Sequence, residues 1–211
     1  MKKSVRAALQ LLLAMFFAMA IAFYLLTARG TTLYGVDQSD PQVPASTAEP
    51  LQSGLKVGEK VHTFYVRAIT GPLKNRSVCY VCRNGDRPVV MIFVRKITPD
   101  LKRLLKGIDA EIDRHRAAGL RGFGVFLAGD GNELLPQVQT LAFDEKINLP
   151  LTIAAAPSDG SAGGTIHPDA AVTVMLYRDQ TVTVNFAYRA LELQGREIDR
   201  ILKGIRALAD E

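Results

Sequence analysis

The strongest constraint on the fold is a nearly continuous apolar run from Pro88 to Val94. A strand with one face in water alternates polar and apolar residues, so a run without polar residues predicts a strand buried on both faces. Such strands are typical of α/β domains, in which other layers cover both faces of the sheet. We therefore expect this run to be the central strand of an α/β domain.

The residues after this run carry the signals of a helix start. Thr98 is a favoured N-cap residue, Pro99 suits the first helical position, and Asp100 places an acid in the first turn. The segment that follows places five apolar side chains on one face of a helix, at Leu101, Leu104, Leu105, Ile108 and Ile112. The sequence thus predicts a helix that packs against the central strand.

Strand-like and helix-like segments alternate along the rest of the chain. A β-like segment from Val61 to Ile69 precedes the central strand, and a hairpin around Arg178-Asp179-Gln180 leads to a last amphipathic helix. A loop rich in Gly and Ser runs from Pro157 to Pro168. The other expected elements are strands at Gly122 to Ala128, Leu149 to Ala154, Ala171 to Tyr177 and Thr181 to Ala187, a helix at Asn132 to Lys146, and the last helix through Ile198, Ile201, Leu202, Ile205 and Leu208.

The order of these elements resembles the thioredoxin-like fold in its redoxin or peroxiredoxin-like form. Val57 to Val61 is similar to the start of redoxin domains, and Arg87 to Phe93 is similar to their central strand. The resemblance covers residues 55–211. It implies an α/β domain with a thioredoxin-like mixed central sheet flanked by helices and an extra N-terminal hairpin.

In that family the reactive thiol lies just after the central strand, where the start of a helix lowers its pKa. The matching residues here, Arg95 to Pro99, contain no cysteine, and Thr98 or a neighbour stands in place of the nucleophile. Pro168 is the nearest candidate for the family's cis-proline, but it precedes the expected strand start at Ala171 by three residues. The resemblance therefore carries neither peroxiredoxin nor ordinary thioredoxin chemistry to this position.

Both cysteines, Cys79 and Cys82, stand just before the central strand in a C-x-x-C spacing. Two sulfurs at this spacing meet only if the backbone bends, because successive side chains of a flat strand point to opposite faces. The leading hypothesis is a redox-active disulfide. By analogy with C-x-x-C enzymes, Cys79 would be the attacking thiol and Cys82 the resolving one, and Arg83 and Arg76 would favour the thiolate.

Two other interpretations of the cysteine pair remain open. One is a permanent structural disulfide or a buried reduced pair. The other is half of a metal site, which would need further ligands from His62, His115 and His167 or from a second chain. We assign no metal and no cofactor from the sequence.

The N-terminus predicts a membrane anchor. Three basic residues precede an apolar segment from Ala7 to Ala28, which is long enough as a helix to cross a bilayer. Residues 1–28 are thus expected to be a signal-anchor, residues 29–54 a flexible linker, and residues 55–211 the thioredoxin-like domain. The positive-inside rule predicts a single-pass protein of the cell membrane whose domain is extracytoplasmic, either periplasmic or extracellular. Signal cleavage, which would give a secreted protein, and a merely buried helix are the alternatives.

The charge of the chain argues against a nucleic-acid partner. Lys2, Lys3 and Arg6 contribute three of the five net positive charges, so the remainder carries about +2, without a basic block that contains aromatic residues. The sequence thus predicts a membrane-anchored thiol-disulfide oxidoreductase that uses Cys79 and Cys82 on protein thiols or disulfides. The alternative is a catalytically inactive thioredoxin-like module that binds a peptide partner.

Overall fold

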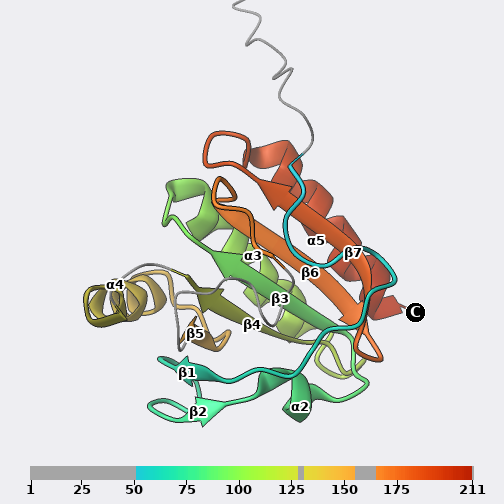
Figure 1. The fold of residues 1–211 in the computed structure, drawn as a ribbon, viewed down its shortest axis with the longest axis horizontal. Coiled ribbons are helices and arrows are strands. Elements are labelled where there is room, and N and C mark those ends of the chain that lie inside the picture. Colours follow the sequence, from blue (N-terminus) through green and yellow to red (C-terminus); the bar gives the residue numbers. More distant parts are fainter. Residues whose placement is uncertain (1–50, 128–130, 155–164, 211) are drawn as a thin grey trace, which may run out of the picture. The chain divides into compact units, whose positions relative to one another are not determined.

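The structure, a computed structural model, describes residues 51–127, 131–154 and 165–210. In these residues seven strands form one sheet in the order β2-β1-β5-β4-β3-β6-β7 (Figure 1). The pairs β3–β4 and β4–β5 are parallel, and the other four pairs are antiparallel. The strands are β1 (Val66–Ala68), β2 (Ser77–Val78), β3 (Val89–Val94), β4 (Arg121–Phe126), β5 (Leu151–Ala154), β6 (Val172–Arg178) and β7 (Thr181–Tyr188), and the helices are α2 (Tyr80–Asn84), α3 (Pro99–Arg114), α4 (Gly131–Asp144) and α5 (Gly195–Asp210).

Several predicted segments lie outside the described residues, namely the anchor at residues 1–28, linker residues 29–50 and loop residues 157–164. Within the described ranges, no helix has the length and apolar character needed to span a bilayer. The last linker residues are packed, because Ser53 is buried and its Oγ lies 2.7 Å from Oγ1 of Thr173.

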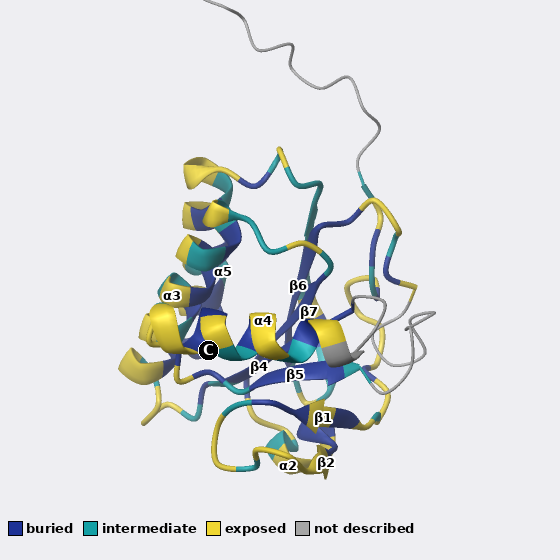
Figure 2. Cartoon of the chain, turned by 90° about the vertical axis from the view of Figure 1, so that its left-hand side faces the viewer, coloured by how far each residue is buried: buried dark blue, intermediate teal, exposed yellow. Residues whose placement is uncertain are grey.

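The central strand β3 is buried along its whole length, as its sequence predicts. Its residues alternate between two clusters: Val90, Ile92 and Val94 join a cluster with side chains from α3, α4 and α5. The intervening residues Val89, Met91 and Phe93 face a second cluster, which contains side chains of residues 55–68 and of α2. Figure 2 shows the result, with buried strands and helices whose outer faces are exposed. A strand between two apolar layers has no polar face, which explains the uninterrupted run.

Helix α3 begins where the sequence predicts. The Thr98 side chain accepts a hydrogen bond from the Leu101 backbone N–H at 3.1 Å, and Pro99 is the first helical residue. The expected β6–β7 hairpin and the C-terminal helix α5 are also confirmed. The N-terminal hairpin that the resemblance implies is formed by β1 and β2.

The β-like segment from Val61 to Ile69 is confirmed as a strand only at Val66–Ala68. The residues just before this segment lie along the start of β7: Gly58 and Glu59 exchange hydrogen bonds with Val182, and the Val61 N–H donates to the Gln180 carbonyl in the turn before β7. The later part pairs with β5. The chain therefore crosses from one edge of the sheet to the other (Figure 1), which a single strand cannot do.

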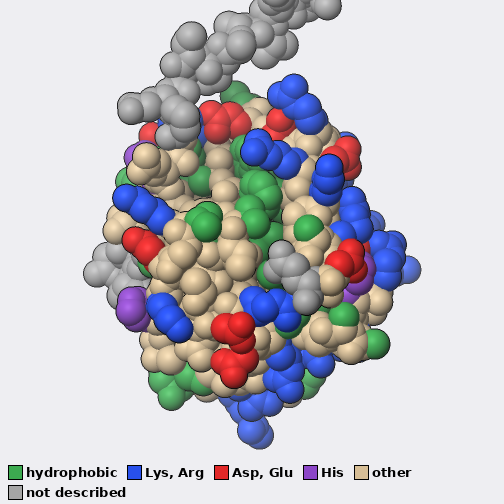
Figure 3. Space-filling model, turned by 90° about the vertical axis from the view of Figure 1, so that its right-hand side faces the viewer, with side chains coloured by type: hydrophobic (Ala, Val, Ile, Leu, Met, Phe, Trp, Pro, Cys, Tyr) green, Lys and Arg blue, Asp and Glu red, His purple; other side chains and the backbone are tan. Residues whose placement is uncertain are grey.

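The residues before the crossing segment, 53–60, cover part of the outer edge of β7. The Asn185 Nδ2 group donates to the carbonyls of Ser53 and Leu55 at 2.8 and 2.7 Å. On the face beyond β7, Figure 3 shows a strip of hydrophobic side chains flanked by charged ones. Covering an edge strand limits pairing with another chain, because unpaired backbone groups on an edge are a template for association.

The turn between β6 and β7 gives a stability prediction. Asp179 and Gln180 have φ values of 50° and 58°, so both lie in the left-handed region that two-residue hairpin turns require. Replacing them by Asn-Gly should raise the free energy of unfolding by about 1 kcal/mol, because Gly adopts positive φ without steric strain. Denaturant unfolding of the double variant measures this effect. Gln180→Ala is the control, and a gain of equal size in that variant would contradict the explanation.

Candidate redox site

The two cysteines lie at the junction of β2 and α2. Cys79 follows β2 in an extended conformation and is the N-cap residue of α2, and Cys82 lies within this one-turn helix. Their Cα atoms are 5.4 Å apart and their sulfurs form a disulfide. The local bend that the spacing predicts is therefore present, and a strand-to-helix junction produces it.

The two ends of the disulfide differ in exposure. Cys79 is 5% exposed and belongs to the apolar cluster beneath α2, whereas Cys82 is exposed. The backbone N–H of Cys82 donates a hydrogen bond to Sγ of Cys79 at 3.1 Å. A hydrogen bond of this kind favours negative charge on the sulfur. Cys82 is thus the exposed residue of the pair, and the sulfur of Cys79 lies beside a donor that can stabilise a thiolate.

The two residues between the cysteines hold the helix on the sheet. Val81 is fully buried, and the Tyr80 ring stacks on Phe123 of β4 with centroids 5.1 Å apart. Burial raises the pKa of the Tyr80 hydroxyl, and the positive charge of Arg83 partly opposes this shift. Sequence reasoning missed this anchoring role, although an aromatic residue followed by a β-branched one inside the motif was the available signal.

The basic residues named in the sequence analysis lie on either side of the disulfide. Arg83 follows Cys82 directly in the last turn of α2, and Arg76 lies in the turn before β2. Both are exposed. Arg83 is therefore the nearer positive charge along the chain to the sulfur that is accessible.

The position of the family's usual thiol is occupied by structural contacts. Thr98 caps α3, and Nη2 of Arg95 donates to the Ile166 carbonyl at 2.9 Å. Within the described residues no peptide bond is cis, so Pro168 does not reproduce the family's cis-proline. The cysteine pair lies elsewhere, before β3 rather than after it.

The three histidines do not gather around the cysteines to form a metal site in the described ranges. No group of three or more His, Cys, Asp or Glu side chains in these ranges has the arrangement needed to hold a metal ion. His115 caps the end of α3, where its Nδ1 lies 2.9 Å from the Glu111 carbonyl oxygen. The backbone N–H of His167 donates to Oγ of Ser53.

The sequence matches no protein-family model and no curated protein. Solved structures do match. One is a protein assigned as the thiol:disulfide interchange protein DsbE from Chlorobium tepidum, with a TM-score of 0.57, 13% identity, and coverage of 74% of this chain and 99% of that chain. The reduced 2-Cys peroxiredoxin of Plasmodium vivax gives a TM-score of 0.57 and 18% identity over 74% of this chain and 83% of that chain.

A third match is a secreted disulfide oxidoreductase of Mycobacterium tuberculosis, homologous to DsbE of E. coli. Its TM-score is 0.51 at 10% identity, over 68% of this chain and 95% of that chain. At these identities the likeness concerns the fold. The chain has a thioredoxin-like fold of mixed α/β structure. More particularly, it is a thioredoxin-like domain with a C-x-x-C disulfide between Cys79 and Cys82.

Proposed function

We propose that this domain is a thiol-disulfide exchange protein in which Cys79 and Cys82 are the reacting pair. The observation that carries the proposal is the disulfide with one exposed and one buried end, in which Sγ of the buried Cys79 accepts a hydrogen bond from the Cys82 N–H. Exchange requires an accessible sulfur to be attacked and a stabilised thiolate to leave. The exposure of Cys82 and the N–H donor beside Sγ of Cys79 support these two requirements.

The exposures favour the opposite order of roles from the one the C-x-x-C analogy gives. A partner thiolate attacks Sγ of Cys82, the Cys79–Cys82 bond breaks, and Cys79 leaves as a thiolate. A second partner thiolate then attacks the partner sulfur of the mixed disulfide and releases Cys82. The two protons lost by the partner's thiols go to the two cysteines or to solvent. The partner gains a disulfide and the protein becomes a dithiol, and the reverse sequence reduces a partner disulfide.

A turnover assay tests this proposal. The oxidised full chain in detergent should oxidise a dithiol peptide about 100-fold faster than the uncatalysed reaction with the same equivalents of glutathione disulfide, because the Cys82 N–H donates to the sulfur of the leaving Cys79 thiolate. The double variant Cys79→Ser/Cys82→Ser is the control and should be inactive. A wild-type rate equal to that of the control would exclude exchange at this pair.

A second candidate function is a catalytically silent module that binds a protein or peptide and keeps the disulfide as a staple. The burial of Cys79 and the lack of a thiol after β3 favour it. In this case the disulfide fixes α2 on the sheet, and its removal would lower the free energy of unfolding. Partner binding would be the function of the domain. The turnover assay separates the two functions.

We also propose that the domain works outside the cytoplasm, held by residues 1–28 as an anchor or released after their cleavage. The proposal rests on the apolar segment and the basic residues before it. A fusion of alkaline phosphatase to the C-terminus, which is active only outside the cytoplasm, should be active. An inactive fusion beside an active cytoplasmic reporter fusion would contradict this location.

A further inference from the structure

Beside α2 lies a pocket of about 970 Å³ that four arginine side chains line. It is bounded by the turn between β1 and β2, α2, the end of α3, the start of β4 and the turn before β5. The arginines come from four separate places in this region. They are Arg83 of α2, Arg87 before β3, Arg116 after α3 and Arg121 of β4.

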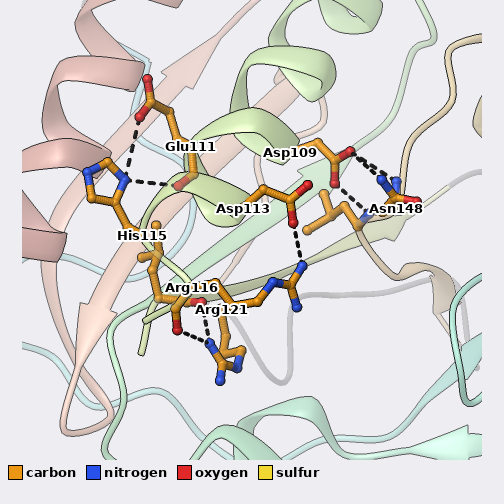
Figure 4. A network of polar contacts seen from close by, with 9 residues as sticks. Asp109, Glu111, Asp113, His115, Arg116, Arg121 and Asn148 are labelled. Atoms are coloured by element: carbon orange, nitrogen blue, oxygen red, sulfur yellow. Dashed lines mark hydrogen bonds and ion pairs between the residues drawn. The ribbon is translucent and has the colours of Figure 1, made fainter. Parts of the chain in front are cut away.

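The acidic side chains of the pocket are already engaged. Asp109 accepts hydrogen bonds from the backbone N–H groups of Asn148 and Leu149 at 3.0 and 2.7 Å. Asp113 pairs with Arg116 (Figure 4). Asp109 thus joins α3 to the turn before β5, and Asp113 pairs with one of the four arginines. The four arginines and two aspartates give the lining residues a net charge of about +2.

Three of the arginines have no carboxylate partner in the described residues. Two of them are oriented by main-chain carbonyls: Nη1 of Arg121 donates to Leu120 at 2.8 Å, and Nη1 of Arg87 donates to Arg83 and Asn84. A guanidinium has five N–H donors, so each still has donors for a ligand. Positioned guanidinium groups with free donors are typical of carboxylate recognition.

Helix α2 carries both part of the pocket lining and Cys82. The residues of α2 that line the pocket, Tyr80, Arg83 and Asn84, share one helix face, and Cys82 lies on another face of the same turn. A helix is about 10 Å across with its side chains. A ligand whose sulfur lies at Cys82 therefore reaches the arginines with groups that are about 10 Å from that sulfur. An extended tripeptide has this length, at about 3.3 Å per residue.

We infer that the arginine-lined pocket binds the carboxylates of a small thiol or disulfide peptide whose sulfur reacts at Cys82. The assignment of this ligand as a substrate rests on the proposed exchange function, whereas binding of the anion at the pocket does not. The pocket would hold at least two carboxylates on Arg87, Arg121 and Arg83 and leave the sulfur over α2.

Binding is tested first with a ligand that cannot exchange. S-methylglutathione, a tripeptide with two carboxylates and a blocked sulfur, should bind the oxidised full chain in calorimetry, and its diamide should not. The double variant Arg87→Gln/Arg121→Gln should bind about tenfold more weakly, because two guanidinium groups that pair with the ligand carboxylates are removed. Arg196→Gln removes an exposed arginine outside the pocket and should leave binding unchanged. If the diamide bound as tightly as S-methylglutathione, or if the double variant bound S-methylglutathione as tightly as the wild type, the inference that this pocket binds carboxylates would be wrong.

Exchange is tested second with the reduced full chain. The rate with the dianionic dithiobis(nitrobenzoate), divided by the rate with neutral dithiodipyridine, should fall about tenfold in Arg87→Gln/Arg121→Gln and stay constant in Arg196→Gln. An unchanged ratio together with anion binding would overturn the substrate assignment. If neither disulfide reacts, the proposed function fails, and the calorimetric result alone decides whether the pocket binds anions.

Discussion

The Cys79→Ser variant is expected to hold a thiol partner covalently on Cys82. The exposed Cys82 can still form a mixed disulfide with the partner. Without Cys79, no second thiol of the chain can attack this mixed disulfide and release the partner. The Cys82→Ser variant keeps only a thiol that is 5% exposed, so its reaction should be about 100-fold slower. Mass spectrometry of each folded variant with excess glutathione disulfide measures adduct formation over time.

The same two variants in denaturant provide the control for this experiment. Unfolding removes the difference in exposure, so both cysteines should then react at similar rates. If folded Cys82→Ser formed its adduct as fast as folded Cys79→Ser, the assignment of Cys82 as the accessible sulfur would be wrong.

The largest effect on stability is expected at Glu111, a charged residue of α3 that is only 4% exposed. Its two carboxylate oxygens accept hydrogen bonds from Arg114 at 2.6 Å and from Arg206 of α5 at 2.7 Å. Figure 4 shows the Glu111 side chain beside His115 at the same end of the helix. Glu111→Gln should lower the free energy of unfolding by about 2 kcal/mol, because two charge-assisted bonds are lost, although the arginines remain partly hydrated.

The matched control for Glu111 is Asp113→Asn on the same helix. The ion pair of Asp113 with Arg116 is more than half exposed on both sides, so its loss should lower stability by less than about 0.5 kcal/mol. Denaturant unfolding of both variants at neutral pH measures the difference. Equal losses in the two variants would show that burial of Glu111 does not strengthen its contacts.

The Glu111 contribution should depend on pH. Burial alone would raise the pKa of the Glu111 carboxyl, but hydrogen bonds and positive charge from Arg114 and Arg206 lower it below its usual value. A carboxyl with a lower pKa in the folded state stabilises the fold above its unfolded pKa, and this stabilisation is lost as the pH falls through the folded pKa. The stability difference between wild type and Glu111→Gln should therefore shrink as the pH falls from neutral to about 3. A difference that is constant with pH would contradict this explanation.

The sequence predicted those parts of the fold whose signals are local. The uninterrupted run of β3, the cap at Thr98 and the amphipathic face of α5 are each encoded within one segment. The segment around Val61 was predicted only in part because its hydrogen bonds go to Val182 and Gln180, about 120 residues later. This segment has the composition of a strand, but it covers the edge of β7 and then crosses the sheet.

The candidate site was predicted only in part, for the same reason. The C-x-x-C spacing identified the pair, but the burial of Cys79 depends on the cluster beneath α2, which includes Phe123 of β4. The arginine-lined pocket unites residues of five segments, and its arginines look like ordinary surface positions in the sequence. Glu111 similarly resembles any charged residue of α3 until Arg206 of α5 is placed beside it.

The most direct test of the central claim is a redox titration of Cys79 and Cys82 in the full chain. Samples are equilibrated in graded dithiothreitol or glutathione buffers, quenched by alkylation and analysed by mass spectrometry. An exchange-active pair should have a reduction potential between about −120 and −270 mV, within the range of known exchange proteins. A potential below about −300 mV, with no reaction in glutathione buffers, would mean that the disulfide is a structural staple and that the exchange function is wrong.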